Sequence, residues 1–197
     1  ISRKWFSNMI VIIDNYDSFT YNLVQYVGVI DTNLEVFRND EITIESLASK
    51  QISHIIISPG PGWPDDAGKT MDIIKCFNNS TPILGICLGH QAIVRAFNGD
   101  IVKCNEIIHG KTSAITFKPS KLFKKVKNPF QATRYHSLCV HRVTLPQELK
   151  VIAETKNNTI MAVEHISKPI FGLQFHPESI ATNQGHRIIK NFLNIKT

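Results

Sequence analysis

A cysteine close to glycines is the first residue of this chain that points to chemistry. Cys87 lies in the segment Gly85–Gln91, where an apolar run ends and a helical pattern begins. Neighbouring glycines permit a sharp turn that exposes the sulfur, and the N-terminus of the following helix favours the thiolate. A merely packed cysteine gives no reason for glycines that weaken both strand and helix. Cys87 is therefore predicted to be a nucleophile, whereas packing roles are expected for Cys76, Cys104 and Cys139.

A histidine and a carboxylate stand two residues apart near the other end of the chain. His176 and Glu178 follow an apolar run that predicts a strand over Ile170–Phe175. The carboxylate can hold the imidazole in the tautomer that accepts a thiol proton. Together with Cys87, the pair predicts covalent acyl transfer through a thioester that water hydrolyses, and an amide substrate would release ammonia. The other histidines considered, His54, His141, His165 and His186, are expected in the core or on the surface.

The segment Ser58–Gly62 is predicted to supply part of an oxyanion hole. Its glycines let the backbone approach a substrate closely, and its prolines stiffen the turn. The backbone amide of Gly60 or Gly62 would pair with that of Leu88 to stabilise negative charge on the substrate oxygen. The alternative is a rigid turn without a catalytic role.

The elements that must position these residues alternate along the first half of the chain. Apolar runs of strand length separate segments with helical spacing, which predicts a parallel sheet with helices on both faces. The motifs follow the carboxyl ends of strands, where open α/β sheets place their sites. Strands are expected at Met9–Ile13, Leu34–Phe37, His54–Ile57 and Pro82–Leu84, and helices at Ser18–Val29, Ile44–Lys50, Gly68–Phe77 and Gly89–Phe97, with Ser18 and Thr43 as N-caps.

The second half changes to short alternating runs, which predict a smaller antiparallel or mixed part of the sheet. Strands are expected at Ser113–Phe117, Leu149–Ala153, Ile160–Val163 and Ile170–Leu173, followed by a helix near Gly185–Ile195. The expected organisation is one α/β domain over residues 9–197, preceded by an N-terminal extension, residues 1–8.

Composition narrows the class of protein further. A chain of 197 residues that is 43% hydrophobic is long enough for one domain with a full core. The cysteines form no Cys-x-x-Cys pair, which argues against a zinc site or a disulfide framework and favours a reducing compartment. No apolar run approaches the roughly 20 residues of a membrane span. The net charge of +6 includes a cluster interpreted as a solvated loop, namely Lys118, Lys121, Lys124, Lys125 and Lys127.

Taken together, these motifs resemble those of the class I glutamine amidotransferases. Within that family the resemblance is greatest to the glutaminase subunits of anthranilate synthase and of aminodeoxychorismate synthase, and it runs from about Met9 to the C-terminal end. Six segments carry it in order, Asp14–Asn22, Ser58–Gly62, Gly85–Gln91, His109–Lys111, Arg134–Leu138 and Gln174–Ser179.

The resemblance implies a flavodoxin-like fold, a fixed set of site residues and no metal or organic cofactor. The catalytic residues would be Cys87, His176 and Glu178. Glutamine and its oxyanion would be held by Gly60, Pro61, Gly62, Leu88, Gln91, Ser137 and Leu138. Lys111 and the tyrosine-containing first motif would contact a partner, close over the substrate or serve only the structure.

The resemblance also implies a partner, because such glutaminases pass ammonia to a separate chorismate-binding synthase protein, component I. We therefore expect a heteromer serving tryptophan biosynthesis, with the folate pathway, or both, as the alternative. A peptidase or γ-glutamyl hydrolase could use the same thiol chemistry, and a non-catalytic regulatory or nucleic-acid-binding protein is a more remote alternative. No nucleic-acid or membrane partner is expected. The expected location of the protein is the cytoplasm or the plastid stroma.

Overall fold

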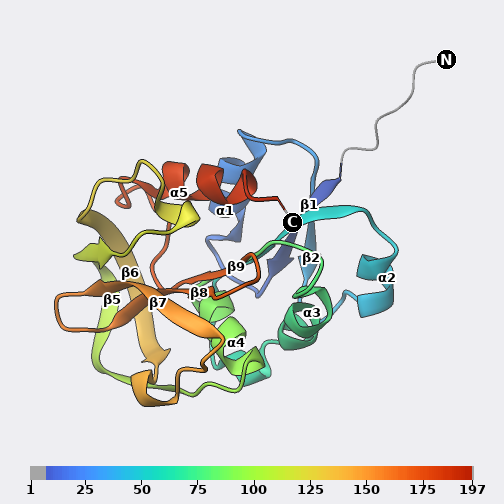
Figure 1. The fold of residues 1–197 in the computed structure, drawn as a ribbon. Coiled ribbons are helices and arrows are strands. Elements are labelled where there is room, and N and C mark those ends of the chain that lie inside the picture. Colours follow the sequence, from blue (N-terminus) through green and yellow to red (C-terminus); the bar gives the residue numbers. More distant parts are fainter. Residues whose placement is uncertain (1–7, 197) are drawn as a thin grey trace.

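The computed structural model of the chain describes residues 8–196, and within them nine strands form one continuous sheet (Figure 1). The strand order is β2-β1-β3-β4-β9-β8-β7-β5-β6. The strands are β1 (Met9–Asp14), β2 (Leu34–Arg38), β3 (Ile52–Ile57), β4 (Ile83–Ile86), β5 (Ile101–Phe117), β6 (Phe130–Val140), β7 (Leu149–Thr155), β8 (Ile160–His165) and β9 (Ile170–Leu173). The predicted extension, residues 1–8, lies outside the described residues except for Asn8.

The strand β9 joins a parallel half of the sheet to an antiparallel half. It runs parallel to β4 on one side and antiparallel to β8 on the other. The predicted α/β class with both kinds of strand is confirmed, but a mostly parallel sheet is wrong, because within residues 8–196 four pairings are parallel and four are antiparallel. The parallel half, β2-β1-β3-β4-β9, has the 2-1-3-4-5 order of flavodoxin-like sheets.

Helices cover both faces of the parallel half, as the alternation of elements predicted (Figure 1). Successive side chains of a strand point to opposite faces. Ile10 and Ile12 of β1 therefore pack in the core that contains α1 and α5, whereas Val11 and Ile13 pack in the core that contains α2, α3 and α4. The helices are α1 (Thr20–Gly28), α2 (Ile44–Ala48), α3 (Thr70–Phe77), α4 (Leu88–Ala96) and α5 (Gly185–Leu193), with 3-10 turns η1 (Pro64–Asp66), η2 (Lys121–Phe123) and η3 (Arg142–Thr144).

The long hairpin of β5 and β6 is the element that sequence patterning missed. Only Ser113–Phe117 was expected as a strand, whereas β5 begins at Ile101 and pairs with β6 along most of its length. The pairing register shifts between Lys103 and Ile108 and again between His109 and Lys111. These irregularities break the two-residue alternation on which the prediction depends.

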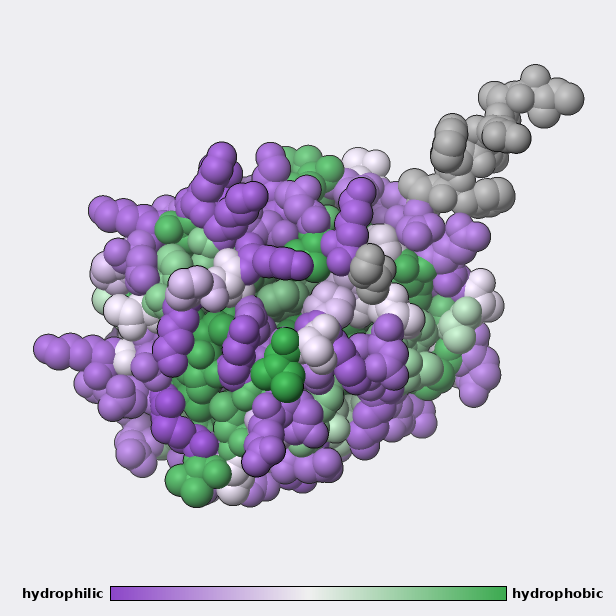
Figure 2. Space-filling model, in the orientation of Figure 1, coloured by the Kyte–Doolittle hydropathy of each residue, from purple (hydrophilic) through white to green (hydrophobic). Residues whose placement is uncertain are grey.

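The outer surface of the described residues is predominantly hydrophilic on the side shown in Figure 2, with apolar residues between long polar side chains. No helix within residues 8–196 combines the length and hydropathy that a membrane span requires.

Of the two predicted helix N-caps, the structure confirms Thr43 and contradicts Ser18. Thr43 precedes α2, and its side-chain oxygen accepts a hydrogen bond from the amide of Ser46 at 3.1 Å. Ser18 is not a cap, because α1 begins at Thr20 and the residue before it is Phe19. The carboxylate of Asp17 instead accepts a hydrogen bond from the Phe19 amide at 2.8 Å.

These contacts predict different effects for two similar substitutions. Thr43→Ala should lower the free energy of unfolding by about 1 kcal/mol, because an amide at the start of α2 loses its partner. Ser18→Ala should change it by less than about 0.5 kcal/mol, as for surface positions without such a contact. Urea unfolding of both variants measures the difference, and equal effects would contradict the assignment of Thr43 as the cap.

Candidate active site

Three loops meet at the carboxyl ends of β1, β3 and β4. Asn15, after β1, holds the segment Ser58–Gly62 after β3: its amide nitrogen Nδ2 donates to the carbonyl of Ser58 at 2.8 Å, and its backbone amide donates to the Ser58 hydroxyl at 2.9 Å. A Cβ atom at Gly60 would lie 2.7 Å from both the carbonyl oxygen of Asn15 and a methyl of Leu88. Position 60 therefore requires glycine, because its backbone packs directly on the two other loops.

Cys87 forms the sharp turn between β4 and α4. Its φ is +52° and its ψ is −100°, a strained conformation for a residue with a side chain, and it precedes the first residue of α4, Leu88. The amide of Leu88 has no partner within the helix because it lies in the first turn. This turn places the thiol at the positive end of α4, next to amides that have no partner within the helix, and such an environment stabilises negative charge.

The sulfur of Cys87 is covered, so the prediction that the turn exposes it was wrong. Cys87 is only 7% exposed. Its Sγ lies 3.6 Å from the carbonyl oxygen of Tyr135 on β6 and 3.6 Å from Nε2 of Gln174 after β9. Sequence patterning missed this cover because it comes from strands that are distant along the chain.

His176 and Glu178 form a buried pair. The Nδ1 atom of His176 lies 2.6 Å from Oε1 of Glu178, and the two side chains are 4% and 1% exposed. The backbone amide of His176 donates to the carbonyl of Thr133 on β6 at 3.0 Å, and its carbonyl accepts from the Thr182 hydroxyl at 2.6 Å. Since Nδ1 is occupied by the carboxylate, Nε2 is the nitrogen that remains for proton exchange, and it has no hydrogen-bond partner within residues 8–196.

The interactions of His176 favour its protonated form. Burial would lower the pKa of its imidazole, but the interactions with the side chains of Cys87 and Glu178 outweigh burial and raise the pKa to about 10. At neutral pH the imidazole therefore holds its proton, which is the state that pairs with a thiolate. The carboxylate of Glu178 stabilises that charge.

Removing this carboxylate is expected to change the pH dependence of the site. In Glu178→Gln, the neutral amide no longer stabilises the imidazolium, so the pKa of His176 should fall from about 10. The alkaline limb of a kcat/KM profile for glutamine hydrolysis should then move down by at least about one pH unit. Glu148→Gln, at an exposed carboxylate, is the control and should leave the profile unchanged.

The raised pKa of His176 also predicts how the free energy of unfolding depends on pH. Because the folded pKa lies above the ordinary value of 6.5, protonated His176 stabilises the folded protein fully below about pH 6.5, and this contribution is lost as the pH rises toward 10. The free energy of unfolding of His176→Gln should therefore fall less than that of the unsubstituted protein between these pH values. Parallel curves would contradict the assigned charge state.

Aromatic rings cover the imidazole. The ring of Tyr135 lies 5.3 Å from that of His176, and Phe19 lies 6.3 Å from it, both edge-on. His109 packs edge-on against Tyr135 at 5.4 Å, and Gly110, with φ at +71°, lets the chain pass close to the same ring. The segment His109–Lys111 thus positions Tyr135, while the exposed Lys111 side chain makes no ion pair within residues 8–196.

A cavity of about 360 Å³ lies beside the candidate oxyanion segment, a size that suits a small ligand. Of the residues predicted to hold substrate, the structure brings three to its wall, Gly62, Ser137 and Leu138. Gly60, Pro61, Leu88 and Gln91 do not line it. Its other walls are Trp63, Lys103, Cys104 and Ile107, which were not predicted.

Gln91 has only part of its amide left for a substrate. Its Nε2 donates to the carbonyl of Leu138 and to Oε1 of Gln174, each at 3.2 Å. Both amide hydrogens are therefore used, and Oε1 is the atom that remains. An acceptor at this position suits an ammonium group rather than a carboxylate.

Another ionisable side chain close to the site, that of His90, is held uncharged by burial. His90, in the segment of Cys87, is completely buried, and burial lowers its pKa to about 3, so it is neutral at physiological pH. Among residues 8–196, His, Cys, Asp and Glu side chains form no group of three that could ligate a metal ion.

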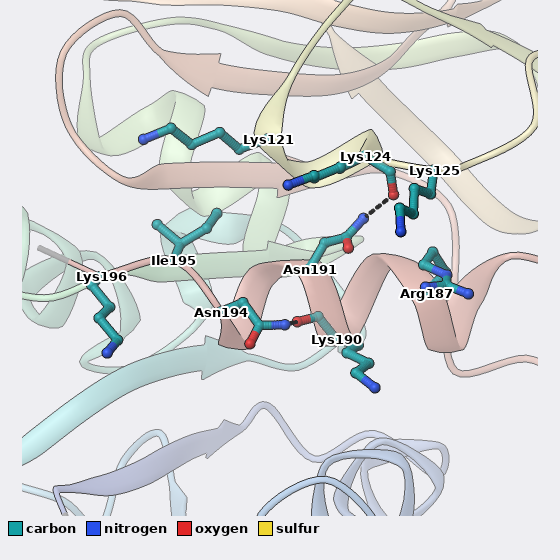
Figure 3. A pocket seen from close by; sticks show the side chains of 9 residues that line it. All are labelled: Lys121, Lys124, Lys125, Arg187, Lys190, Asn191, Asn194, Ile195 and Lys196. Carbon is teal, nitrogen blue, oxygen red and sulfur yellow. Dashed lines mark hydrogen bonds between the residues drawn. The ribbon is translucent and has the colours of Figure 1, made fainter.

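A basic groove of about 520 Å³ lies outside the candidate active site, between η2 and α5 (Figure 3). Asn191 joins its walls by donating to the carbonyls of Leu122 and Lys124. In Figure 3 the ammonium groups of Lys121 and Lys190 point away from each other, and no aromatic side chain among residues 8–196 lines the groove. The described residues of the groove therefore lack the aromatic side chains on which nucleic-acid bases stack.

The fold and site define an α/β protein in which a cysteine, a histidine and a glutamate meet at the carboxyl edge of the sheet. The chain belongs to the family described as Glutamine amidotransferase class-I, which it matches over residues 11–195.

Several proteins are similar in sequence to this chain over nearly its whole length. It is 50% identical to the aminodeoxychorismate/anthranilate synthase component 2 of Bacillus subtilis and 51% identical to the anthranilate synthase component 2 of Pyropia yezoensis, covering 94% of this chain and 95% and 98% of those proteins. It is 53% identical to the bifunctional protein TrpGD of Thermotoga maritima over 95% of its own length, but spans only 32% of that protein.

A solved structure shares the fold. One subunit of a putative GMP synthase, from Thermoplasma acidophilum, superposes with a TM-score of 0.83 at 24% identity, covering 94% of this chain and 92% of the other. At that identity the likeness supports the fold alone.

Proposed function

We propose that this chain is the glutamine-hydrolysing subunit of anthranilate synthase and that it supplies ammonia to a chorismate-binding component I. The observation that carries the chemistry is the buried His176–Glu178 pair, whose protonated imidazole interacts with the sulfur of Cys87. The relatives named anthranilate synthase component 2 support the particular synthase.

In the proposed reaction, the Cys87 thiolate attacks the side-chain amide carbon of glutamine. His176 gives its Nε2 proton to the departing nitrogen, which leaves as ammonia, and a thioester remains on the sulfur. The imidazole then takes a proton from water and keeps it, while the hydroxide attacks the thioester carbon and the carbon–sulfur bond breaks. This step restores the thiolate beside the imidazolium, and glutamate departs after its new carboxyl group loses a proton to solvent. Glu178 holds the imidazole and stabilises its charge throughout.

The substrate is proposed to occupy the cavity beside Gly62, Ser137 and Leu138. Backbone amides of Leu88 and of Gly60 or Gly62 would stabilise the oxyanion. Gln91 lies outside the lining of this cavity, and its carbonyl oxygen is the atom that would accept from the ammonium group of glutamine, because the Gln91 nitrogen already has two acceptors.

Exposed apolar side chains around the site support docking of a synthase subunit. Ile180, two residues after Glu178, is 96% exposed, and Tyr21, on α1 and two residues after Phe19, is 66% exposed. Ile107, on the wall of the candidate substrate cavity, is 74% exposed. Exposed apolar residues of this kind, each next to a residue of the site, suit a surface that a partner covers.

The test is glutamine hydrolysis with and without the partner. The chain alone, and the chain mixed with a chorismate-binding anthranilate synthase component I, are assayed for glutamate and anthranilate. We expect component I to increase glutamate release and glutamine to replace added ammonia in anthranilate formation. Cleavage of γ-glutamyl peptides by the lone chain, without response to component I, would instead favour a hydrolase.

A second candidate is the corresponding subunit of aminodeoxychorismate synthase, alone or shared. It is favoured by the Bacillus subtilis relative, whose name covers both synthases, and by a Klebsiella aerogenes aminodeoxychorismate synthase component 2 that is 45% identical. The two candidates are distinguished by whether the gene rescues growth of a tryptophan auxotroph or of a p-aminobenzoate auxotroph.

The cysteines Cys76, Cys87, Cys104 and Cys139 are all free, which suits the proposed cytoplasmic or plastid setting.

A further inference from the structure

The sulfur of Cys87 has a neighbour that the proposed mechanism does not use. Gln174 follows β9, directly before the segment that carries His176, and its side chain is completely buried. Its Nε2 donates toward Sγ of Cys87 at 3.6 Å. Buried amides require partners on both their oxygen and their nitrogen, and here one of those partners is the candidate nucleophile.

The direction of this hydrogen bond is set by a chain of amides. The carbonyl of Leu138 can only accept, so the nitrogen of Gln91 must face it. The same nitrogen then presents its second hydrogen to Oε1 of Gln174, which leaves the Gln174 nitrogen directed at the sulfur. Reversing the Gln174 amide would bring two donors together and place its oxygen against Sγ. The network therefore admits one orientation.

The two protonation states of the sulfur use different partners. As a thiol, Cys87 can donate to the carbonyl of Tyr135 at 3.6 Å. As a thiolate it has no hydrogen to donate, and the Gln174 N–H becomes a charge-assisted donor, which is stronger than the same contact with a neutral thiol. A donor that binds one state more strongly shifts the equilibrium toward that state.

We propose that Gln174 stabilises the thiolate of Cys87 by donating a hydrogen bond from Nε2, and that Gln91 acts as a positioning residue by orienting the Gln174 amide. The proposal rests on the proposed role of Cys87 as nucleophile. It adds a side-chain donor to the helix terminus and His176, and it connects the sulfur to the carbonyl of Leu138 on the substrate cavity.

The experiment measures the sulfur directly. Alkylation of Cys87 by iodoacetamide between pH 5 and 10 is followed by mass spectrometry of a peptide cleaved after Phe77, because that cleavage separates Cys87 from Cys76. Gln174→Met keeps the approximate shape but removes the donor, and the rate at pH 6 should fall about tenfold as the profile moves up by about one pH unit. Gln174→Glu places a carboxylate at the sulfur and should move the profile further in the same direction.

Matched variants separate this role from general loss of structure. Gln131→Met, at an exposed position on β6, should leave the profile unchanged. Gln91→Met leaves Gln174 in place without its fixed orientation and should give a smaller shift of the same sign. This variant tests the proposal independently if Gln174→Met does not fold.

A folded Gln174→Met whose Cys87 profile lies within twofold of the unsubstituted protein would overturn the proposal, as would an equal shift in Gln131→Met. The readout needs no glutamine, so it is independent of the proposed function. If the shift occurs in a chain that does not hydrolyse glutamine with component I, the proposed function fails while the role of Gln174 stands.

Discussion

Replacing Cys87 by serine is expected to lower kcat for glutamine hydrolysis by about a thousandfold or more. Serine preserves the size and the strained turn, but its hydroxyl does not ionise at neutral pH, so the interaction with protonated His176 no longer supplies a nucleophile. Loss of a nucleophile in comparable triads has effects of this order or larger. Glutamate release in the presence of component I is the measurement.

The control for this substitution is Cys76→Ser, at an exposed cysteine on α3, which should retain full activity. A complex containing Cys87→Ser should still form anthranilate from added ammonia, because the substitution leaves the synthase subunit intact. A Cys87→Ser protein that hydrolyses glutamine at a normal rate would exclude a thioester at Cys87.

Replacing Gly85 by alanine is expected to cost about 3 kcal/mol or more of folding free energy, near the upper end for overpacking. The added methyl would overlap the carbonyl oxygen of Gly89 and lie 2.8 Å from the amide nitrogen of His90. Both are backbone atoms, so no side-chain rotation relieves the contact. Relief requires moving α4 away from β4, which also displaces the Cys87 turn.

Gly28→Ala is the matched control. Gly28 ends α1, and a Cβ atom there meets only a methyl of Leu34 at 3.7 Å, an ordinary contact. Alanine is the better helix former, so this variant should be neutral or more stable by up to about 1 kcal/mol. Urea unfolding measures both variants. Similar stability of Gly85→Ala and Gly28→Ala would contradict the close approach of α4 to β4.

The parallel half of the fold was predictable because its elements are locally consistent. Runs such as Ile55–Ile57 are apolar throughout since both faces of their strand are buried, and α3 and α5 have clear helical spacing. The β5–β6 hairpin was not predictable in the same way. Its strands carry buried polar residues, including Arg134 and His136, and shift register twice.

The candidate site was likewise predictable only in part. Residue types and motif spacing indicated Cys87, His176, Glu178 and the glycine-rich segment, and the structure places these close together. The supporting contacts were missed: Asn15 anchoring the Ser58–Gly62 turn, Tyr135 over the imidazole, and Gln174 at the sulfur. Each was part of a quoted motif, but its partner lies tens of residues away in the sequence.

The sequence by itself determined the reactive side chains and the glycines around Cys87, because those depend on residue type and local backbone. Tertiary structure decided that the sulfur is covered. The carbonyl of Tyr135 reaches Cys87 from β6, and the amide of Gln174 and the His176–Glu178 pair reach it from the segment after β9. Their combined effect on the sulfur depends on their distances from it and on the exclusion of water. Both are set by the folded arrangement in which β9 pairs with β4 on one side and with β8 on the other.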